Sequence, residues 1–275
     1  MKSPVLMRRA DALTLLWLAS LSLCDVLMIT WQLWWLMPIA VVLGISACAA
    51  KHNHTHCATF GPRWLNRLMD LWLTALTGTS TSGIRVAHQI LHHGNNQSPD
   101  DFVRCSLVAH LPPGRALFQY VPLVIREVWK TKSPDHVSQR CATLRRDVLV
   151  ERIFLWCFIV WIVFSQGLLA LVMLGIPWLA GQWFLIAMNL PQHDGCDAAS
   201  ALAHSRNVTG RWANWLFLNN GYHTAHHEWP ARHWSELPAL HQQHIADEMP
   251  AHLASASLTG FWIAWWQQRR KGGLA

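Results

Sequence analysis

Two long stretches of the sequence carry almost no charge. Between Ala12 and Ala50 only Asp25 is charged, and between Ile153 and Gln192 no residue is charged. Each stretch is about 40 residues long, which at roughly 20 residues per crossing allows two membrane-spanning helices. The pattern therefore predicts two helical hairpins, with four spans at about 12–30, 34–50, 153–174 and 177–191.

Breaks within these stretches indicate where each hairpin turns. The first turn is predicted at Trp31–Trp35, because Pro38 just after it suits the first turn of a following helix. The second turn is predicted at Gly175–Pro177, where two helix-disfavouring residues flank Ile176. A shorter apolar stretch, Leu68–Leu76, is too short to span and is expected to lie at the interface or under the hairpins.

The positions of Lys and Arg predict the orientation. Neither predicted turn contains a basic residue, whereas both ends of the chain and the segment between the hairpins do. By the positive-inside rule, residues 51–152 and 192–275 and both termini are cytoplasmic. The first span lacks a small-residue cleavage site and is expected to be retained. The chain is thus predicted to be all-α, a single integral membrane domain over residues 1–275 with a cytoplasmic helical cap.

Composition agrees with membrane residence. Of 275 residues, 52% are hydrophobic and 13% are charged, about half the charged fraction of a typical soluble domain. Trp occurs 18 times and favours membrane–water boundaries; Trp262, Trp265 and Trp266, ahead of three cations, have the pattern of an interfacial anchor. The formal net charge is +7, but no nucleic-acid-binding module accompanies it, so lipid headgroups or an acidic carrier are the expected partners. The seven Cys residues form no C-x-x-C pair and are expected to be reduced.

Histidine is the outlying residue type, with 17 occurrences, and it is the commonest metal ligand. Three clusters have the patterns H-x3-H, H-x3-HH and H-x2-HH: His52 and His56; His88, His92 and His93; His223, His226 and His227. Residues three or four apart share one face of a helix, so each cluster can present its imidazoles to one point. A further histidine, His193, follows the fourth span as His52 follows the second.

These nine histidines exceed the four ligands of a closed zinc site, so two metal ions with four or five ligands each are predicted. His204 is an alternative to His193 as the ninth ligand. Asp194, Asp197 and Glu228 are candidates to accept hydrogen bonds from ligating imidazoles. The other histidines are interpreted as surface or hydrogen-bonded core residues: His54, His110, His136, His233, His241, His244 and His252.

The three ordered boxes resemble those of the membrane fatty acid desaturase and hydroxylase superfamily, and the stretch from Ala203 to Leu240 is similar to bacterial acyl desaturases. The resemblance implies two iron ions held by the box histidines and His193, with Asn189 holding a metal-bound water. It also implies O2-dependent introduction of a double bond into a fatty acyl chain, at a bacterial inner membrane. No catalytic side chain beyond the metal ligands is implied.

Other products are the alternative to a double bond. The pattern Asn189-x3-His193-x-Gly195 is also similar to membrane alkane hydroxylases, whose longer third box is absent here. A hydroxylated chain, an acetylenic bond or a terminal alkene made by decarboxylation therefore stays open. A metal transporter is disfavoured, because transporter ligands lie near the bilayer midplane and the predicted spans contain no histidine.

The reaction requires partners outside this chain. The acyl substrate can be carried by lipid, CoA or acyl carrier protein. Electrons must come from a ferredoxin, rubredoxin or cytochrome, because the sequence has no Cys cluster of ferredoxin or rubredoxin spacing and no haem-binding segment. The densest basic region is a predicted docking surface for this donor: Lys130, Lys132, Arg140, Arg145 and Arg146. The alternatives are that these cations bind a phosphopantetheine carrier or a phospholipid headgroup, or that they only set the membrane orientation.

Overall fold

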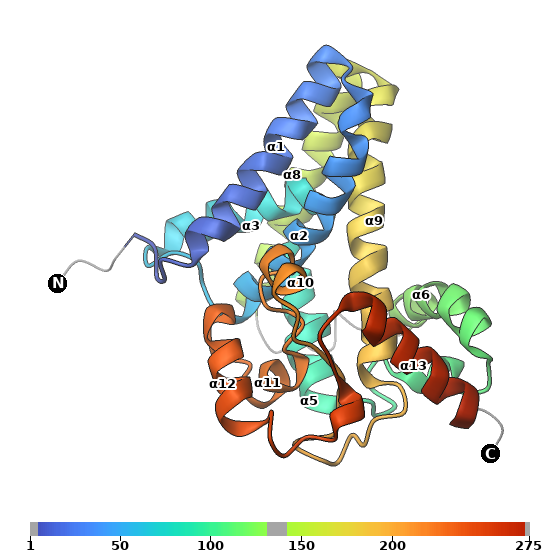
Figure 1. The fold of residues 1–275 in the computed structure, drawn as a ribbon. Coiled ribbons are helices and arrows are strands. Elements are labelled where there is room, and N and C mark those ends of the chain that lie inside the picture. The colour runs from blue at the N-terminus through green and yellow to red at the C-terminus, as the bar shows by residue number, and fades with distance from the viewer. Residues whose placement is uncertain (1–4, 131–141, 273–275) are drawn as a thin grey trace. The chain divides into compact units, whose positions relative to one another are not determined.

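The computed structural model describes residues 5–130 and 142–272 and is predominantly helical, which confirms the all-α prediction (Figure 1). The chain divides into two compact units, unit 1 (Met1–Val86 and His136–Leu185) and unit 2 (Ala87–Asp135 and Ile186–Ala275). Unit 1 holds α1 (Asp11–Trp31), η1 (Trp34–Leu36), α2 (Met37–His56), α3 (Arg63–Thr77), α4 (Thr81–Ile84), α8 (Ala142–Gln166) and most of α9 (Leu168–His193). That the whole chain acts as one domain stays a prediction.

Unit 2 begins within a π-helical segment, η2 (Arg85–His92), and includes the last turns of α9. Its other elements are α5 (His93–Asn95), η3 (Cys105–Val108), α6 (Pro113–Lys130), β1 (Asn207–Val208), α10 (Arg211–Leu216), α11 (His223–Glu228), η4 (Trp234–Glu236), α12 (Leu237–His244), η5 (Ala251–Leu253), β2 (Ala254–Ser255) and α13 (Leu258–Gly272). The two short strands pair in parallel, with Asn207 opposite Ala254.

Within the described residues, four helices are long and apolar enough to cross a membrane: α1, α2 with η1, α8 and α9. The first hairpin turns where the sequence predicts, since α1 ends at Trp31 and α2 begins at Met37, with Pro38 in its first turn. Large apolar side chains along these helices are exposed, including Trp31 at 70% and Phe164 at 87%. Such exposure is expected of helices that face lipid.

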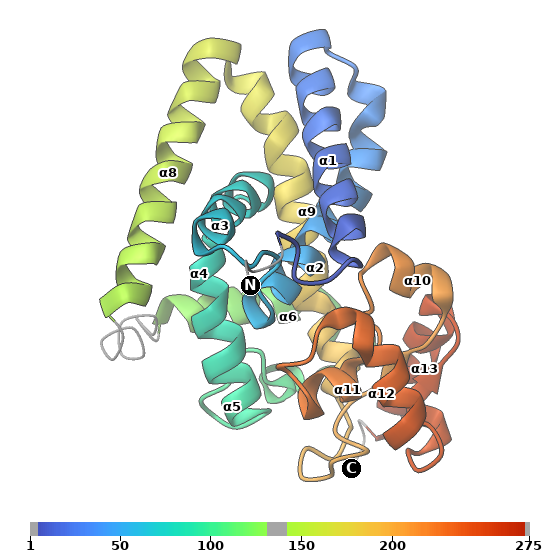
Figure 2. The same cartoon turned by 90° about the vertical axis from the view of Figure 1, so that its left-hand side faces the viewer.

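The second hairpin turns eight residues earlier than predicted. Helix α8 ends at Gln166, Gly167 adopts a left-handed φ of 84°, and α9 starts at Leu168 (Figure 2). Gly tolerates this backbone conformation because it has no Cβ. The predicted turn at Gly175–Pro177 is wrong, because α9 continues through both residues; apolar helices tolerate Pro where neighbouring groups satisfy the freed backbone.

Glycines bring α2 and α9 into close contact. A Cβ on Gly181 would lie 2.7 Å from the carbonyl oxygen of Gly44, and a Cβ on Gly44 would lie 2.9 Å from that of Pro177. Small residues of this kind allow apolar helices to approach backbone to backbone. The residue after α3, Gly78, has φ of 66° and its Cα hydrogen faces the ring of Trp178, where a Cβ would lie 2.5 Å from the ring. These contacts place α9 directly against α2 and against the end of α3.

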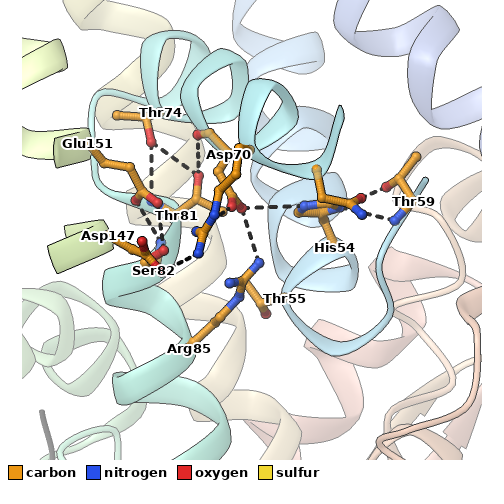
Figure 3. A network of polar contacts seen from close by, with 12 residues as sticks. His54, Thr55, Thr59, Asp70, Thr74, Thr81, Ser82, Arg85, Asp147 and Glu151 are labelled. Atoms are coloured by element: carbon orange, nitrogen blue, oxygen red, sulfur yellow. Dashed lines mark hydrogen bonds and ion pairs between the residues drawn. The ribbon is translucent and has the colours of Figure 1, made fainter. Parts of the chain in front are cut away.

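Buried carboxylates hold α8 against α3 and α4 in unit 1 (Figure 3). Glu151 accepts hydrogen bonds from the backbone N–H of Ser82 (2.8 Å), from its hydroxyl (2.6 Å) and from the Ser80 hydroxyl (2.7 Å). Asp147, also on α8 and buried, pairs with the guanidinium of Arg67 on α3. Because each carboxylate is compensated, α8 can begin in a charged segment and continue as an apolar helix.

In unit 2, α6 and α13 pack around Tyr120 and Trp265, which are both fully buried. The indole N–H of Trp265 donates to Asp194 Oδ2 at 2.8 Å, and Arg269 pairs with the same oxygen at 2.5 Å. The prediction of an interfacial anchor is therefore wrong for Trp265, which is a core residue. Its carboxylate partner lies far away in sequence, so the Trp and Arg pattern of the tail alone does not reveal it.

Candidate metal centre

The second histidine box lies on a π-helix. Segment η2 covers Arg85–His92 and α5 begins at His93. Successive turns of a π-helix close between residues i and i+5 instead of i and i+4. His88 and His93 therefore share a face, with 3.0 Å between their Nε2 atoms, while His92 points elsewhere. The sequence prediction paired His88 with His92 on an α-helical face, which is wrong in this respect.

Four histidines of unit 2 form one compact group: His92, His193, His223 and His227. Their candidate ligand atoms all lie within 4.8 Å of one another. The Nε2 atoms of His193 and His223 are 2.8 Å apart, a distance at which two imidazoles share one proton or one metal ion. His92 and His227 each have a buried Nε2 without a hydrogen-bond partner in the described chain. A bound cation would satisfy these nitrogens, so the four residues fit a metal site.

The outer nitrogens of two of these rings are held by protein oxygens. His92 Nδ1 lies 2.9 Å from Asp101 Oδ2, and His193 Nδ1 lies 3.1 Å from the backbone oxygen of His204. Such bonds place the proton on Nδ1 and leave Nε2 as the ligand atom. Asp101 is fully buried and also accepts from the backbone N–H groups of Gln97 and Val103, both at 3.0 Å.

Asp101 is the functional candidate that the sequence analysis missed. It lies in a loop after the second box, where no helical spacing connects it to His92. The three predicted acceptors have other partners in the structure. Asp194 binds Trp265 and Arg269, Asp197 accepts from the backbone N–H of Ala199 at 3.0 Å, and Glu228 lies 3.2 Å from the Nε2 of His204.

A second group in unit 2 contains His88, His93 and His226. Their Nε2 atoms are separated by 3.0 Å (His93 to each of the others) and 3.4 Å (His88 to His226). The rings of His93 and His227 stack with centroids 4.2 Å apart, so this group adjoins the first. Each adjacent pair, His92–His93 and His226–His227, contributes one ring to each group.

In unit 1, His52 and His56 lie one turn apart at the end of α2, with ring centroids 5.1 Å apart. His54, between them, has a structural environment: its Nδ1 lies 2.8 Å from Thr59 Oγ1 and its Nε2 lies 3.4 Å from Asp70 (Figure 3). The α-helical spacing of the first box therefore directs two imidazoles to one side and the third to another.

Comparison with known proteins identifies the family. The model of the fatty acid desaturase family matches residues 29–260. The chain belongs to the fatty acid desaturase family. Membership implies an oxidoreductase, and together with the four apolar helices it indicates a membrane protein. A search of curated proteins found no match to the chain.

The electrostatics of this desaturase-family centre favour neutral imidazoles. Burial, and secondarily the neighbouring histidines, lower the pKa of His223 and of His227 well below the ordinary value. The neutral ring is the form that binds a metal. Burial also lowers the pKa of His204, with Glu228 opposing that shift. His204 supports the four-histidine group through its backbone oxygen, and its ring centroid lies 5.4 Å from that of His227.

The resemblance implies that Asn189 holds a metal-bound water, and in this structure hydrogen bonds fix the orientation of its side-chain amide. Its Nδ2 donates to the Val103 oxygen at 2.6 Å and to the Tyr120 hydroxyl at 2.8 Å. Burial raises the pKa of Tyr120 well above its ordinary value, so the phenol stays protonated and donates to Val103 in turn. Both partners of Nδ2 are thus defined, and Oδ1 is directed away from them. Its role toward water stays a prediction.

A buried guanidinium fixes the end of α9, the helix that carries His193. Arg206 is 1% exposed and donates through Nη1 to the carbonyl oxygens of Pro191 (2.8 Å) and Asp194 (2.6 Å). Its backbone N–H donates to Gln192 at 2.7 Å, and its Nη2 donates to Gln268 of α13. The last carbonyls of a helix lack intrahelical partners and carry partial negative charge. Arg206 therefore caps α9 on both sides of His193.

Proposed function

We propose that this protein is an O2-dependent di-iron fatty acyl desaturase. The observation that carries the proposal is the compact group of His92, His193, His223 and His227, two of whose buried nitrogens lack partners within the described residues. Family membership adds that such a centre acts on acyl chains. The acyl substrate reaches the centre in or beside the membrane that the four apolar helices cross.

The histidines would hold two iron ions. One set is the four-histidine group, and the other comprises His88, His93 and His226 together with the first-box histidines that the resemblance assigns to the centre, His52 and His56. Bound iron would supply the change of oxidation state needed to reduce O2 and remove hydrogen from an unactivated C–H bond. Imidazole also suits zinc, copper and nickel, so the choice of iron rests on the family.

The chain's own residues position the ligands. Asp101 and the His204 carbonyl hold His92 and His193 with Nε2 turned inward, and Arg206 fixes the helix end that carries His193. In the reaction, two hydrogens leave adjacent acyl carbons, and O2 takes up these two hydrogens together with two external electrons and two protons to give two water molecules. A fixed ligand set lowers the reorganisation that accompanies such a step.

Electrons would come from a ferredoxin, rubredoxin or cytochrome on the cytoplasmic side. Arg145 and Arg146 near the start of α8 are exposed, which supports their assignment to a basic docking surface. Lys130, also assigned to it, is the last residue of α6 in the other unit. Lys132 and Arg140, also assigned to that surface, lie outside the described residues. The cytoplasmic orientation rests on the positive-inside rule.

The test is the lipid profile of bacteria that express this chain with a ferredoxin reductase system. Mass spectrometry of fatty acids and hydrocarbons should show a new unsaturated acyl species, absent for His223→Ala and present for His252→Ala, a control at an exposed histidine. A hydroxy acid, acetylenic acid or 1-alkene with the same dependence would replace desaturation by the alternative reaction. Equal profiles for wild type and His223→Ala would refute the assigned centre.

A further inference from the structure

Helix α6 has an apolar stripe that faces away from the core of unit 2. Phe118, Pro122, Ile125 and Trp129 are all exposed, with Phe118 at 77% and Trp129 at 81%. At about 100° per residue, these four positions fall within an arc of roughly 60° along the helix. Large apolar side chains this exposed and aligned on one face indicate an interaction surface.

The orientation of this stripe is fixed by the opposite face of α6. Ala116, Tyr120, Val121 and Val124 are each no more than 2% exposed and belong to the core around Trp265. Rotating the helix to bury the stripe would expose this core, which costs about 25 cal/mol for every Å² of apolar surface. The stripe therefore remains outside the packed interior of unit 2.

The charged side chains beside the stripe are both positive. Arg115 and Arg126 are exposed and lie roughly 60–80° from Phe118 around the helix, along one edge of the stripe. The only acidic residue of α6, Glu127, projects from the opposite side and pairs with Arg104 at 3.0 Å. An apolar band bordered by cations is the pattern of a helix that lies in a membrane interface.

We infer that α6 lies in the plane of the membrane interface, with the stripe among acyl chains and Arg115 and Arg126 against anionic headgroups. The described residues already include four apolar helices, and the first described residue of the span α8 lies 12 positions after the last described residue of α6. Lipid is favoured over a second copy of this chain, because an antiparallel two-fold contact between two such stripes would bring their arginine edges together. Trp129 near the end of the stripe suits an interface, where an indole meets both apolar and polar surroundings.

The inference can be tested by photocrosslinking of the full chain in nanodiscs of phosphatidylcholine and phosphatidylglycerol in equal amounts. Benzoylphenylalanine replaces Phe118 in one variant, Trp129 in a second and Gln243, exposed on α12, in a control. These exposed positions accept an aromatic group without disturbing the core. After illumination, peptide mass spectrometry should find phospholipid adducts at both stripe positions at several-fold higher yield than at position 243.

A second variant tests the arginines. Combining Arg115→Gln and Arg126→Gln should lower the share of phosphatidylglycerol among the adducts at position 118, because the attraction to anionic headgroups is lost. An unchanged share would overturn the assigned role of the two arginines. Adducts no more frequent than at position 243, or adducts joining two copies of the chain, would overturn the lipid as the occupant. None of these measurements depends on catalytic activity or bound metal.

Discussion

Replacing Asp101 by Asn tests whether the geometry of the four-histidine group controls metal binding. Asp101 accepts three hydrogen bonds, at 2.9 Å from His92 Nδ1 and at 3.0 Å from two backbone N–H groups. Asn has nearly the same shape but only one acceptor oxygen. Its NH2 group must face either His92 or a backbone N–H, so at least one favourable contact becomes unfavourable. If it faces His92, the ring is driven to the tautomer whose Nε2 carries the proton.

The magnitude follows from the type of contact that is lost. A hydrogen bond to a charged group contributes about 1.5–3 kcal/mol. Mutation of residues that support metal-ligating histidines costs roughly 10–100-fold in metal affinity, which corresponds to about 1.4–2.7 kcal/mol. Because both routes give the same range, Asp101→Asn should weaken iron binding by one to two orders of magnitude (~1.4–2.7 kcal/mol) while the hairpins stay intact.

The assay is a competition titration of the purified protein with an iron chelator, followed by iron analysis of the protein fraction. Asp100→Asn is the matched control, because the neighbouring carboxylate is exposed. Thermal unfolding of the metal-free proteins separates a folding defect from a binding defect. Iron affinity of Asp101→Asn equal to that of Asp100→Asn, in a folded protein, would refute the reasoning.

Three further changes have defined outcomes. Gly78→Ala should lower the free energy of unfolding by about 1–3 kcal/mol, because residue 78 has a positive φ and its new Cβ would collide with the indole ring of Trp178. Gly175→Ala is the control, because a Cβ at this position in α9 meets open space and should not lower that free energy. Unfolding curves that are equal for the two variants would contradict this prediction. Arg206→Lys should lower both the melting temperature and the amount of iron that the protein retains, because an ammonium lacks the planar guanidinium that bonds to the carbonyls of Pro191 and Asp194. An unchanged iron content would show that Arg206 does not position His193. The stability of the metal-free protein should fall as the pH drops below about 6.5. Burial lowers the pKa of His227 in the folded protein, so the unfolded chain binds a proton there at a higher pH than the folded chain does. In thermal scans, His227→Gln should reduce the dependence of the melting temperature on pH.

The number of spans could be predicted from the sequence because it follows from the length of the two uncharged stretches. The first hairpin could be predicted as well, because a helix-starting proline marks its turn. The second turn could not, because the segment around Gly167 is as apolar as the segment around Pro177. The charged start of α8 also conceals the helix boundary. Glu151 looks like a residue outside a membrane helix until its partners, Ser80 and Ser82, are known, and they lie about 70 positions away.

The histidines could be assigned to a centre from their spacing, but not to its two groups. Adjacent residues such as His226 and His227 belong to different groups because their rings point in different directions, and these directions depend on the local helix geometry. Asp101 could not be found from spacing, since the chain brings it to His92 through a loop. The hydrogen-bonded supports of a site are set by tertiary structure, whereas its ligands leave a pattern in the sequence.

The π-helical segment relates two motifs that look different in sequence. His88 and His93 are five residues apart on a π-helix, while His223 and His227 are four apart on the α-helix α11, and each pair shares a face. The extra residue in H-x3-HH compared with H-x2-HH is thus absorbed by the wider turn. In evolution, a single-residue insertion or deletion between the box histidines can be compensated by a change of helix type, so box spacing and helix type can vary together without loss of the ligand pair.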